Sequence, residues 1–150
     1  MKRRFKLTPP DPKEKELHAS VAHMLDWMLL PPALYTTFPA GGYLLSPAAA
    51  GQLQRKGLKP GMPDILVFGG SGTCIGIELK VGKNRLSNLQ KEMFDKLERA
   101  GIACHVCRCL EDVVYALRVN GFPVRPGIAT KEPSHEIIPG VRDLDRKSVV

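Results

Sequence analysis

Three charged residues near the middle of the chain, Asp64, Glu78 and Lys80, have types and spacing suited to phosphoryl chemistry. Glu78 and Lys80 lie two residues apart within an apolar run that is typical of a strand. Because side chains alternate along a strand, both face one side, while Ile77 and Leu79 face the other and anchor the strand in the core. An exposed polar strand face would explain Glu78 and Lys80 equally well.

The position of Asp64 favours a chemical explanation. A glycine-rich segment at 69–72 predicts a tight reversal between a strand at 64–68 and a strand at 73–81. If the reversal centres on Ser71, residues equidistant from it lie opposite one another, which places Asp64 across from Glu78. Such neighbours have Cβ atoms about 5 Å apart, and like charges there destabilise a sheet. A register slip of one residue would turn Asp64 to the other face.

Two clustered carboxylates beside an ammonium group predict a site for a hard divalent cation. Mg²⁺ or Mn²⁺ would be held by Asp64 and Glu78, with waters and a substrate phosphate completing the coordination. Such an ion polarises a phosphoryl oxygen and lowers the pKa of a bound water, which Lys80 can orient or activate. The predicted reaction is phosphodiester hydrolysis.

The charge of the chain favours a polyanionic partner. Its 150 residues include 22 Lys and Arg against 15 Asp and Glu, so the formal net charge is +7, which favours nucleic acid through counterion release. Any single basic cluster is also explained by a solvated surface. We expect nucleic-acid contacts from five basic residues: Lys59, Lys83, Arg85, Arg55 and Lys56.

Other chemistries fit the sequence poorly. The turn at 69–72 lacks the Gly-Lys-Ser/Thr signature of a nucleotide-binding loop, so no nucleotide cofactor is expected, and no motif places a nucleophilic Ser or Cys beside a histidine. Cys104, His105, Cys107 and Cys109 lie in one predicted strand without a second ligand pair, which disfavours zinc. We expect reduced, packed cysteines, with Cys107, Cys109 and His105 on one strand face.

The elements that must position these residues alternate between helices and strands. Asp11, Ser46 and Ser87 are predicted N-caps, and Leu17, Val21, Leu25 and Met28 form the apolar stripe of the first helix. The predicted order is a helix from 12 to before Pro31, a strand at 34–38, a helix at 47–56, strands at 64–68 and 73–81, a helix at 88–100, a strand at 102–108 and a helix at 111–119.

The chain length fits one domain. We expect a basic N-terminal arm at 1–10, a nuclease-like domain at 11–125 and a loosely structured tail at 126–150. No run approaches the roughly 18 apolar residues of a membrane helix, and the start lacks a signal peptide. These features predict an intracellular protein with no membrane partner.

The motifs resemble those of the PD-(D/E)XK nuclease superfamily and, within it, of the VRR-NUC family of virus-type replication and repair nucleases. The resemblance runs from about Glu16 to Leu117 and rests on three strings: Gly61-Met62-Pro63-Asp64-Ile65-Leu66-Val67, Gly76-Ile77-Glu78-Leu79-Lys80 and Leu86-Ser87-Asn88-Leu89-Gln90. It implies an α/β fold with a restriction-endonuclease-like core, in which a central mixed β-sheet of about four strands is flanked by helices. Ala40-Gly41-Gly42 departs from the Asn-Gly-Gly that related sequences often carry.

The resemblance also extends the candidate site. It implies Asp64 and Glu78 as metal ligands, with the Leu79 backbone carbonyl as a further candidate, and Lys80 in catalysis. It implies a site glutamate on the first helix, for which Glu16 is the candidate, although a solvated helix position explains Glu16 as well. Gln90 matches a family glutamine and also completes a capping box with the Ser87 cap.

The function that the resemblance implies is that of a metal-dependent endonuclease acting on DNA in replication, recombination or repair. Standalone relatives lead us to expect a homodimer that selects branched DNA, such as four-way junctions or flaps, and leave open a phage protein acting in the host cytoplasm. The alternatives are a catalytically inactive nucleic-acid-binding module with the same fold and a hydrolase of small phosphate esters. Opposed carboxylates disfavour the first, because they repel phosphate, and the net charge disfavours the second.

Overall fold

The structure, a computed structural model, describes residues 12–38 and 46–127. Within these residues a single mixed sheet has the strand order β1-β2-β3-β4, in which β2 pairs antiparallel with β1 and β3, and β4 is parallel to β3. The predicted α/β fold with a mixed sheet is confirmed. The strands are β1 (Leu34–Thr37), β2 (Ile65–Phe68), β3 (Cys74–Leu79) and β4 (Ala103–Cys107).

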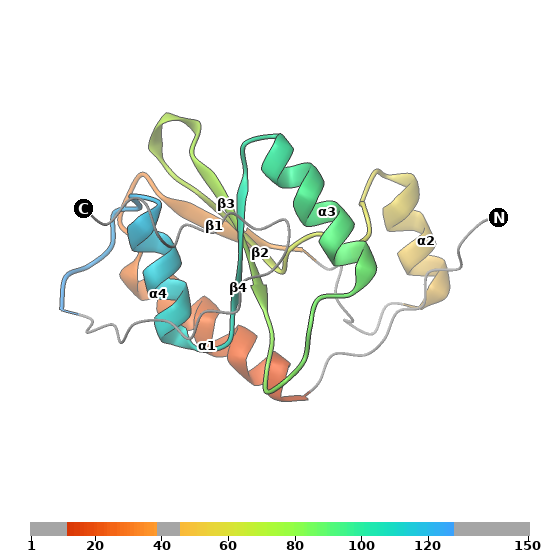
Figure 1. Ribbon diagram of the computed structural model, residues 1–150, viewed down its shortest axis with the longest axis horizontal. Helices are drawn as coiled ribbons and strands as arrows, with labels where there is room; N and C mark the ends of the chain where they lie inside the picture. The colour runs from red at the N-terminus through yellow and green to blue at the C-terminus, as the bar shows by residue number, and fades with distance from the viewer. Residues whose placement is uncertain (1–11, 39–45, 128–150) are drawn as a thin grey trace.

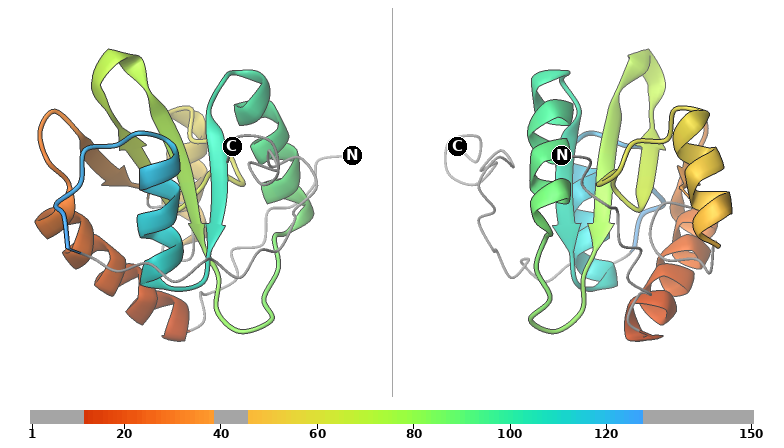
Figure 2. Two further views of the ribbon diagram at one scale, coloured as in Figure 1. Left: turned by 60° about the vertical axis from the view of Figure 1, so that its left-hand side comes forward. Right: turned by 90° about the vertical axis from the view of Figure 1, so that its right-hand side faces the viewer.

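Helices lie on both sides of this sheet (Figures 1 and 2). The first and last helices pack on one face and the third packs on the other, whereas the second has no buried residue. None of the described helices combines the length and apolar character needed to cross a membrane. The helices are α1 (Pro12–Met28), α2 (Pro47–Arg55), α3 (Asn88–Arg99) and α4 (Leu110–Val119), with a short 3-10 helix, η1, at Gly70–Gly72.

The predicted order of elements is confirmed within the described residues. The caps at Ser46 and Ser87 are confirmed too, since each hydroxyl accepts a backbone N–H of its own helix. Four predictions fall outside the described residues: the basic arm at 1–10, the cap at Asp11, the Ala40-Gly41-Gly42 segment, and the tail from 128 onward.

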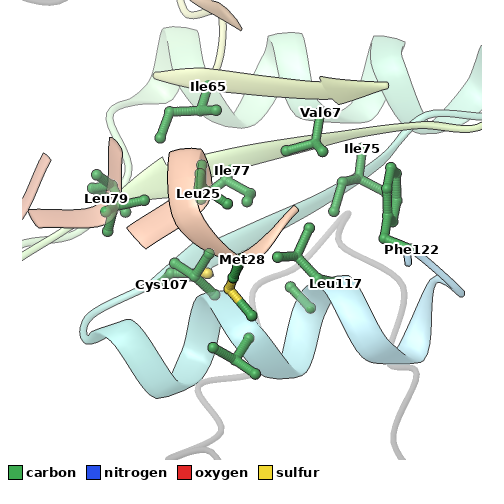
Figure 3. Close-up of a cluster of buried hydrophobic side chains, with 14 residues drawn as sticks. Leu25, Met28, Ile65, Val67, Ile75, Ile77, Leu79, Cys107, Leu117 and Phe122 are labelled. Carbon is green, nitrogen blue, oxygen red and sulfur yellow. The ribbon is translucent and has the colours of Figure 1, made fainter. Parts of the chain in front are cut away.

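The main core lies between the sheet and the α1 and α4 pair (Figure 3). Alternate strand residues point into it, because a strand presents every second side chain to one face. Full burial of one Ile, Leu or Val side chain stabilises the fold by about 1.5–3 kcal/mol, so this layer anchors the hairpin that carries the candidate site. Its fully buried members include Val21, Leu25 and Met28 of α1, Ile65 and Val67 of β2, Ile75 and Ile77 of β3, and Val113 and Leu117 of α4.

Strand β4 contributes to both faces. Cys107 packs in the main core, whereas Cys104 packs under α3 with Leu86 and Phe94. The prediction that Cys109 shares a strand face with Cys107 is wrong, because β4 ends at Cys107 and Cys109 is the N-cap of α4. The chain turns there because the Asp112 carboxylate accepts the Arg108 N–H at 2.9 Å.

The hairpin of β2 and β3 has the predicted register. The pairs run from Phe68 with Cys74 to Ile65 with Ile77, so paired residues are equidistant from Ser71. Ser71 itself turns the chain with a φ of 60°. Asp64 directly precedes β2 and Glu78 directly follows Ile77, so both carboxylates come to the same end of the hairpin.

Candidate active site

Asp64 is held at the start of β2 by the opposite strand. Its Oδ2 atom accepts the backbone N–H of Leu79 at 2.8 Å, one residue beyond Glu78. Asp64 also contributes its carbonyl, which accepts the N–H of Phe38 at 3.3 Å and so continues the pairing toward β1. The bond from Leu79 orients the carboxylate toward the end of β3.

Two glycines allow the segment before Asp64 to pack closely. A Cβ on Gly76 would lie 2.7 Å from Cγ of Pro63 and 3.1 Å from the Cys104 sulfur, so the buried Pro63 fits only because residue 76 has no side chain. Gly61, with a φ of 82°, packs so closely on the first turn of α3 that a Cβ would overlap the Leu89 carbonyl. The segment 61–64 therefore packs closely against both β3 and α3.

Glu78 is the most unusual residue of the site, because it is a buried acid. Only 2% of it is exposed. Its Oε1 atom accepts the Gln90 side-chain amide at 2.6 Å and forms an ion pair with the Lys80 ammonium at 3.0 Å. Its Oε2 atom is buried and accepts no hydrogen bond from any described residue. A buried carboxylate oxygen without a donor is costly unless something positive binds it.

Gln90 performs two structural roles with one side chain. Its carbonyl oxygen accepts the Ser87 N–H at 2.9 Å, and its own backbone N–H is donated to the Ser87 hydroxyl at 3.2 Å, which completes a capping box. Its amide nitrogen meanwhile donates to Glu78. The N-terminal turn of α3 therefore fixes the orientation of the buried carboxylate.

The pKa values of both carboxyl groups are raised above their ordinary values. Burial, and then the charge of Asp64, raises the pKa of Glu78 to about 8 against the opposing effect of Lys80. Burial also raises the pKa of Asp64, against the Leu79 N–H and the nearby His18 and Lys80. Without a bound cation, the site therefore favours the protonated form of Glu78 near neutral pH.

Helix α1 approaches this site with residues other than the predicted Glu16. Glu14 and His18, one turn apart and half-buried, both act electrostatically on Asp64. Glu16 is exposed and lies about 200° around the helix from Glu14. The structure thus brings Glu14, and not Glu16, to the site. Glu14 lies on the same helix face as the buried Val21, so helical phase was the signal that could have found it.

The remaining predicted residues are Leu79 and five basic residues. The Leu79 N–H is donated to Asp64, and the Leu79 side chain lies in the core. The role of the Leu79 carbonyl as a metal ligand stays a prediction. Lys83 and Arg85 precede α3, and Lys59 precedes the Gly61 contact with α3. All five predicted basic contacts are exposed: Arg55, Lys56, Lys59, Lys83 and Arg85.

The donor set fits a hard divalent cation. Two carboxylates meet with one unpartnered buried oxygen, and a lysine ammonium lies beside them. No group of three or more His, Cys, Asp or Glu in the described part of the chain is placed to hold a metal. Water and substrate oxygens would thus complete the shell, as Mg²⁺ prefers.

Comparison with known proteins gave matches to a family model and to solved structures. The model of the VRR-NUC domain family matches residues 10–110, more than half of the chain. A solved structure titled "VRR_NUC domain protein" is similar with a TM-score of 0.50 and 20% sequence identity, over 75% of this chain and 88% of that one. At this identity the structural likeness concerns the fold alone. No curated protein matches the chain.

Proposed function

Because the chain belongs to the VRR-NUC family, we propose that it is a metal-dependent nuclease that hydrolyses DNA phosphodiester bonds at Asp64, Glu78 and Lys80. The observation that carries this proposal is the buried, unpartnered Oε2 atom of Glu78 beside a second carboxylate. One buried oxygen of Glu98 and one of Asp112 also lack a donor among the described residues, so the feature that distinguishes Glu78 is the second carboxylate, Asp64, whose charge helps to raise the Glu78 pKa. A carboxyl group that has a raised pKa, an oxygen without a donor and a second carboxylate beside it is suited to bind a cation.

Asp64 and Glu78 would hold the ion, either Mg²⁺ or Mn²⁺. When bound, the ion would stabilise charge on the phosphate and lower the pKa of a bound water. The Leu79 N–H keeps Asp64 in place, and Gln90 does the same for Glu78. Both ligands are thus oriented before any ion arrives.

Lys80 is the residue with the most direct role in proton handling. Its ammonium lies 3.0 Å from Glu78, with only 12% of its side chain exposed. From there it can orient the attacking water and stabilise negative charge that develops on the phosphate. Because this amine is nearly buried beside the carboxylates, it has little surface for binding DNA. Its loss should therefore affect the chemical step rather than DNA binding.

The DNA substrate is supported by the charge and its placement. The formal net charge is +7, and exposed basic residues lie in the two segments that adjoin the first turn of α3. Phosphate contacts of this kind contribute sequence-independent affinity. We extend the proposal to a homodimer that cuts branched DNA, which follows from the family resemblance.

The test is cleavage of four-way junction, flap and linear DNA by purified protein with Mg²⁺ or Mn²⁺. Wild type should cut only with metal, and K80A should be at least about a hundredfold slower. K96A, an exposed lysine on α3, should cut normally. Circular dichroism would verify that each variant is folded.

Two results would contradict the proposal. DNA binding by folded wild type without any cleavage would favour the inactive binding module instead. Undiminished cleavage by K80A would remove Lys80 from the mechanism. Equal rates on junction and linear DNA would reject the preference for branched substrates while leaving the nuclease itself in place.

A further inference from the structure

The connection from β3 to α3 carries two of the exposed cations, Lys83 and Arg85, on either side of Asn84. It begins with a turn in which the Asn84 N–H is donated to the Val81 carbonyl at 3.1 Å. This connection leaves β3 directly after Lys80, so the two cations stand close to the carboxylate site along the chain. We refer to residues 82–85 as the basic loop.

Arg108, directly after the edge strand β4, binds the basic loop. Its guanidinium donates through Nη1 to the Gly82 carbonyl at 2.9 Å and through Nη2 to the Asn84 carbonyl at 2.8 Å. Arg108 itself sits at the end of β4, where its backbone N–H is fixed by the Asp112 carboxylate at 2.9 Å. A guanidinium fork is rigid and planar, so two such bonds fix both the position and the direction of the loop.

A third contact ties the basic loop to α1. The Asn84 side-chain amide donates to the Glu14 carboxylate at 3.2 Å, and Figure 1 shows the connection after β3 reaching the start of α1. Glu14 in turn acts on Asp64. The loop is thus braced by α1 and by the β4 end, while the side chains of Lys83 and Arg85 stay exposed between these braces.

This arrangement suits a surface that must meet a ligand without first becoming ordered. Ordering a flexible, rotamer-rich segment on binding costs affinity, and bracing it in advance removes much of that cost. The cations themselves make none of the bracing bonds described above, which come from Arg108, Asn84 and Glu14. The division between bracing groups and outward cations therefore points to a ligand with negative charge.

We propose that the basic loop is a preformed contact for DNA phosphates flanking the one that is cut, with Lys83 and Arg85 as the contacting residues and Arg108 as their positioning residue. This inference rests on the proposed nuclease function. The chemistry recognised is the backbone phosphate, so the contact adds affinity without sequence preference. Arg108 acts through the loop and touches no DNA itself.

The test is steady-state cleavage together with DNA binding by fluorescence anisotropy over a range of salt concentrations. K83A/R85A should raise KM about tenfold or more, reduce the salt slope of binding by about one to two, and change kcat less than about twofold. R108A should raise KM about tenfold with kcat nearly unchanged. R99A, whose exposed guanidinium pairs with Asp95 at the far end of α3, should behave as wild type.

The decisive comparison is R108A in two backgrounds. If Arg108 acts through the loop cations, its tenfold effect on KM should shrink to less than about twofold in the K83A/R85A background. R108K, which keeps the charge but cannot form the fork, should behave like R108A.

Three outcomes would overturn the inference while leaving the nuclease in place. One is wild-type KM in K83A/R85A, whose exposed sites cannot prevent folding. Another is an equal effect of R108A in both backgrounds, and the third is a loss confined to kcat. Absence of any cleavage by wild type would instead reject the proposed function, and with it this inference.

Discussion

Two ionisable residues with shifted pKa values lie on adjacent strands: the buried Glu78 on β3 and the partly buried His105 on β4, where His105 pairs with Ile77. Burial moves the pKa of each toward the neutral form, to about 8 for Glu78 and to about 4 for His105. The two residues share the leading cause of their pKa shifts. Their partners differ.

His105 is compensated by its surroundings. The Asn120 amide lies 3.0 Å from its Nε2 atom, a contact that suits a neutral imidazole accepting at this nitrogen. Glu78 instead faces Asp64 and keeps one oxygen without a donor. A shifted pKa is thus shared by a structural residue and a site residue, and the second carboxylate beside Glu78 separates them.

The largest expected effect is on the cleavage rate, which should separate Glu78 from His105. E78Q removes a ligand while keeping shape, and should lower the single-turnover cleavage rate about a thousandfold. H105Q, the matched change on the neighbouring strand, should stay within about threefold of wild type. Similar losses in both variants would show that burial, and not the carboxylate pair, is what matters.

The next effect tests the partners of the two residues. Q90A removes the donor that orients Glu78 and should lower metal affinity or cleavage about tenfold to a hundredfold, as loss of outer ligand-orienting groups does. N120A removes the corresponding partner of His105 and should leave cleavage unchanged. A Q90A enzyme with normal metal affinity and rate would reduce Gln90 to a helix cap.

Much of this comparison could be predicted from the sequence, because it rests on local periodicity. The glycine-rich turn around Ser71 predicted the hairpin register, and strand alternation predicted that Glu78 and Lys80 lie on one face. The family was recognisable from the same motifs, and its match covers residues 10–110. Short-range rules suffice wherever a turn fixes a pairing.

Other features required three-dimensional packing. The phase of α1 brings Glu14 to the site in place of the predicted Glu16. Cys109 lies outside β4 because the bond between the Arg108 N–H and the Asp112 carboxylate ends the strand. The capping box of Gln90 was readable from sequence. Its bond to Glu78 was not, since it depends on how α3 docks beside Gly61.

The two residues also predict opposite slopes of stability with pH. The raised pKa of Glu78 means that the folded state holds a proton that the unfolded state loses, so metal-free stability should fall as pH rises from about 4.5 to about 8. The lowered pKa of His105 means that stability should fall as pH drops from about 6.5 to about 4. Chemical denaturation across pH should show E78Q losing the first slope and H105Q the second. An unaltered pH profile in E78Q would contradict the buried acid.

The smallest effect concerns the charge repulsion itself. Without metal, D64N removes a like-charge contact and should hold or raise the melting temperature, with a gain in the free energy of unfolding of up to about 1 kcal/mol. With metal, D64N should lose the stabilisation that wild type gains, because a ligand is gone. Thermal melts with and without Mn²⁺ measure both. Equal metal-induced stabilisation in D64N and wild type would oppose the assignment of Asp64.

The most direct test of the account is calorimetric titration of Mn²⁺ into the protein at pH 7 in two buffers of different ionisation enthalpy. We predict binding accompanied by proton release, because Glu78 with a pKa of about 8 must lose its proton to become a ligand. E78Q should abolish this binding, and H105Q should retain it. Failure of wild type to bind Mn²⁺, or equal binding by E78Q, would contradict the account.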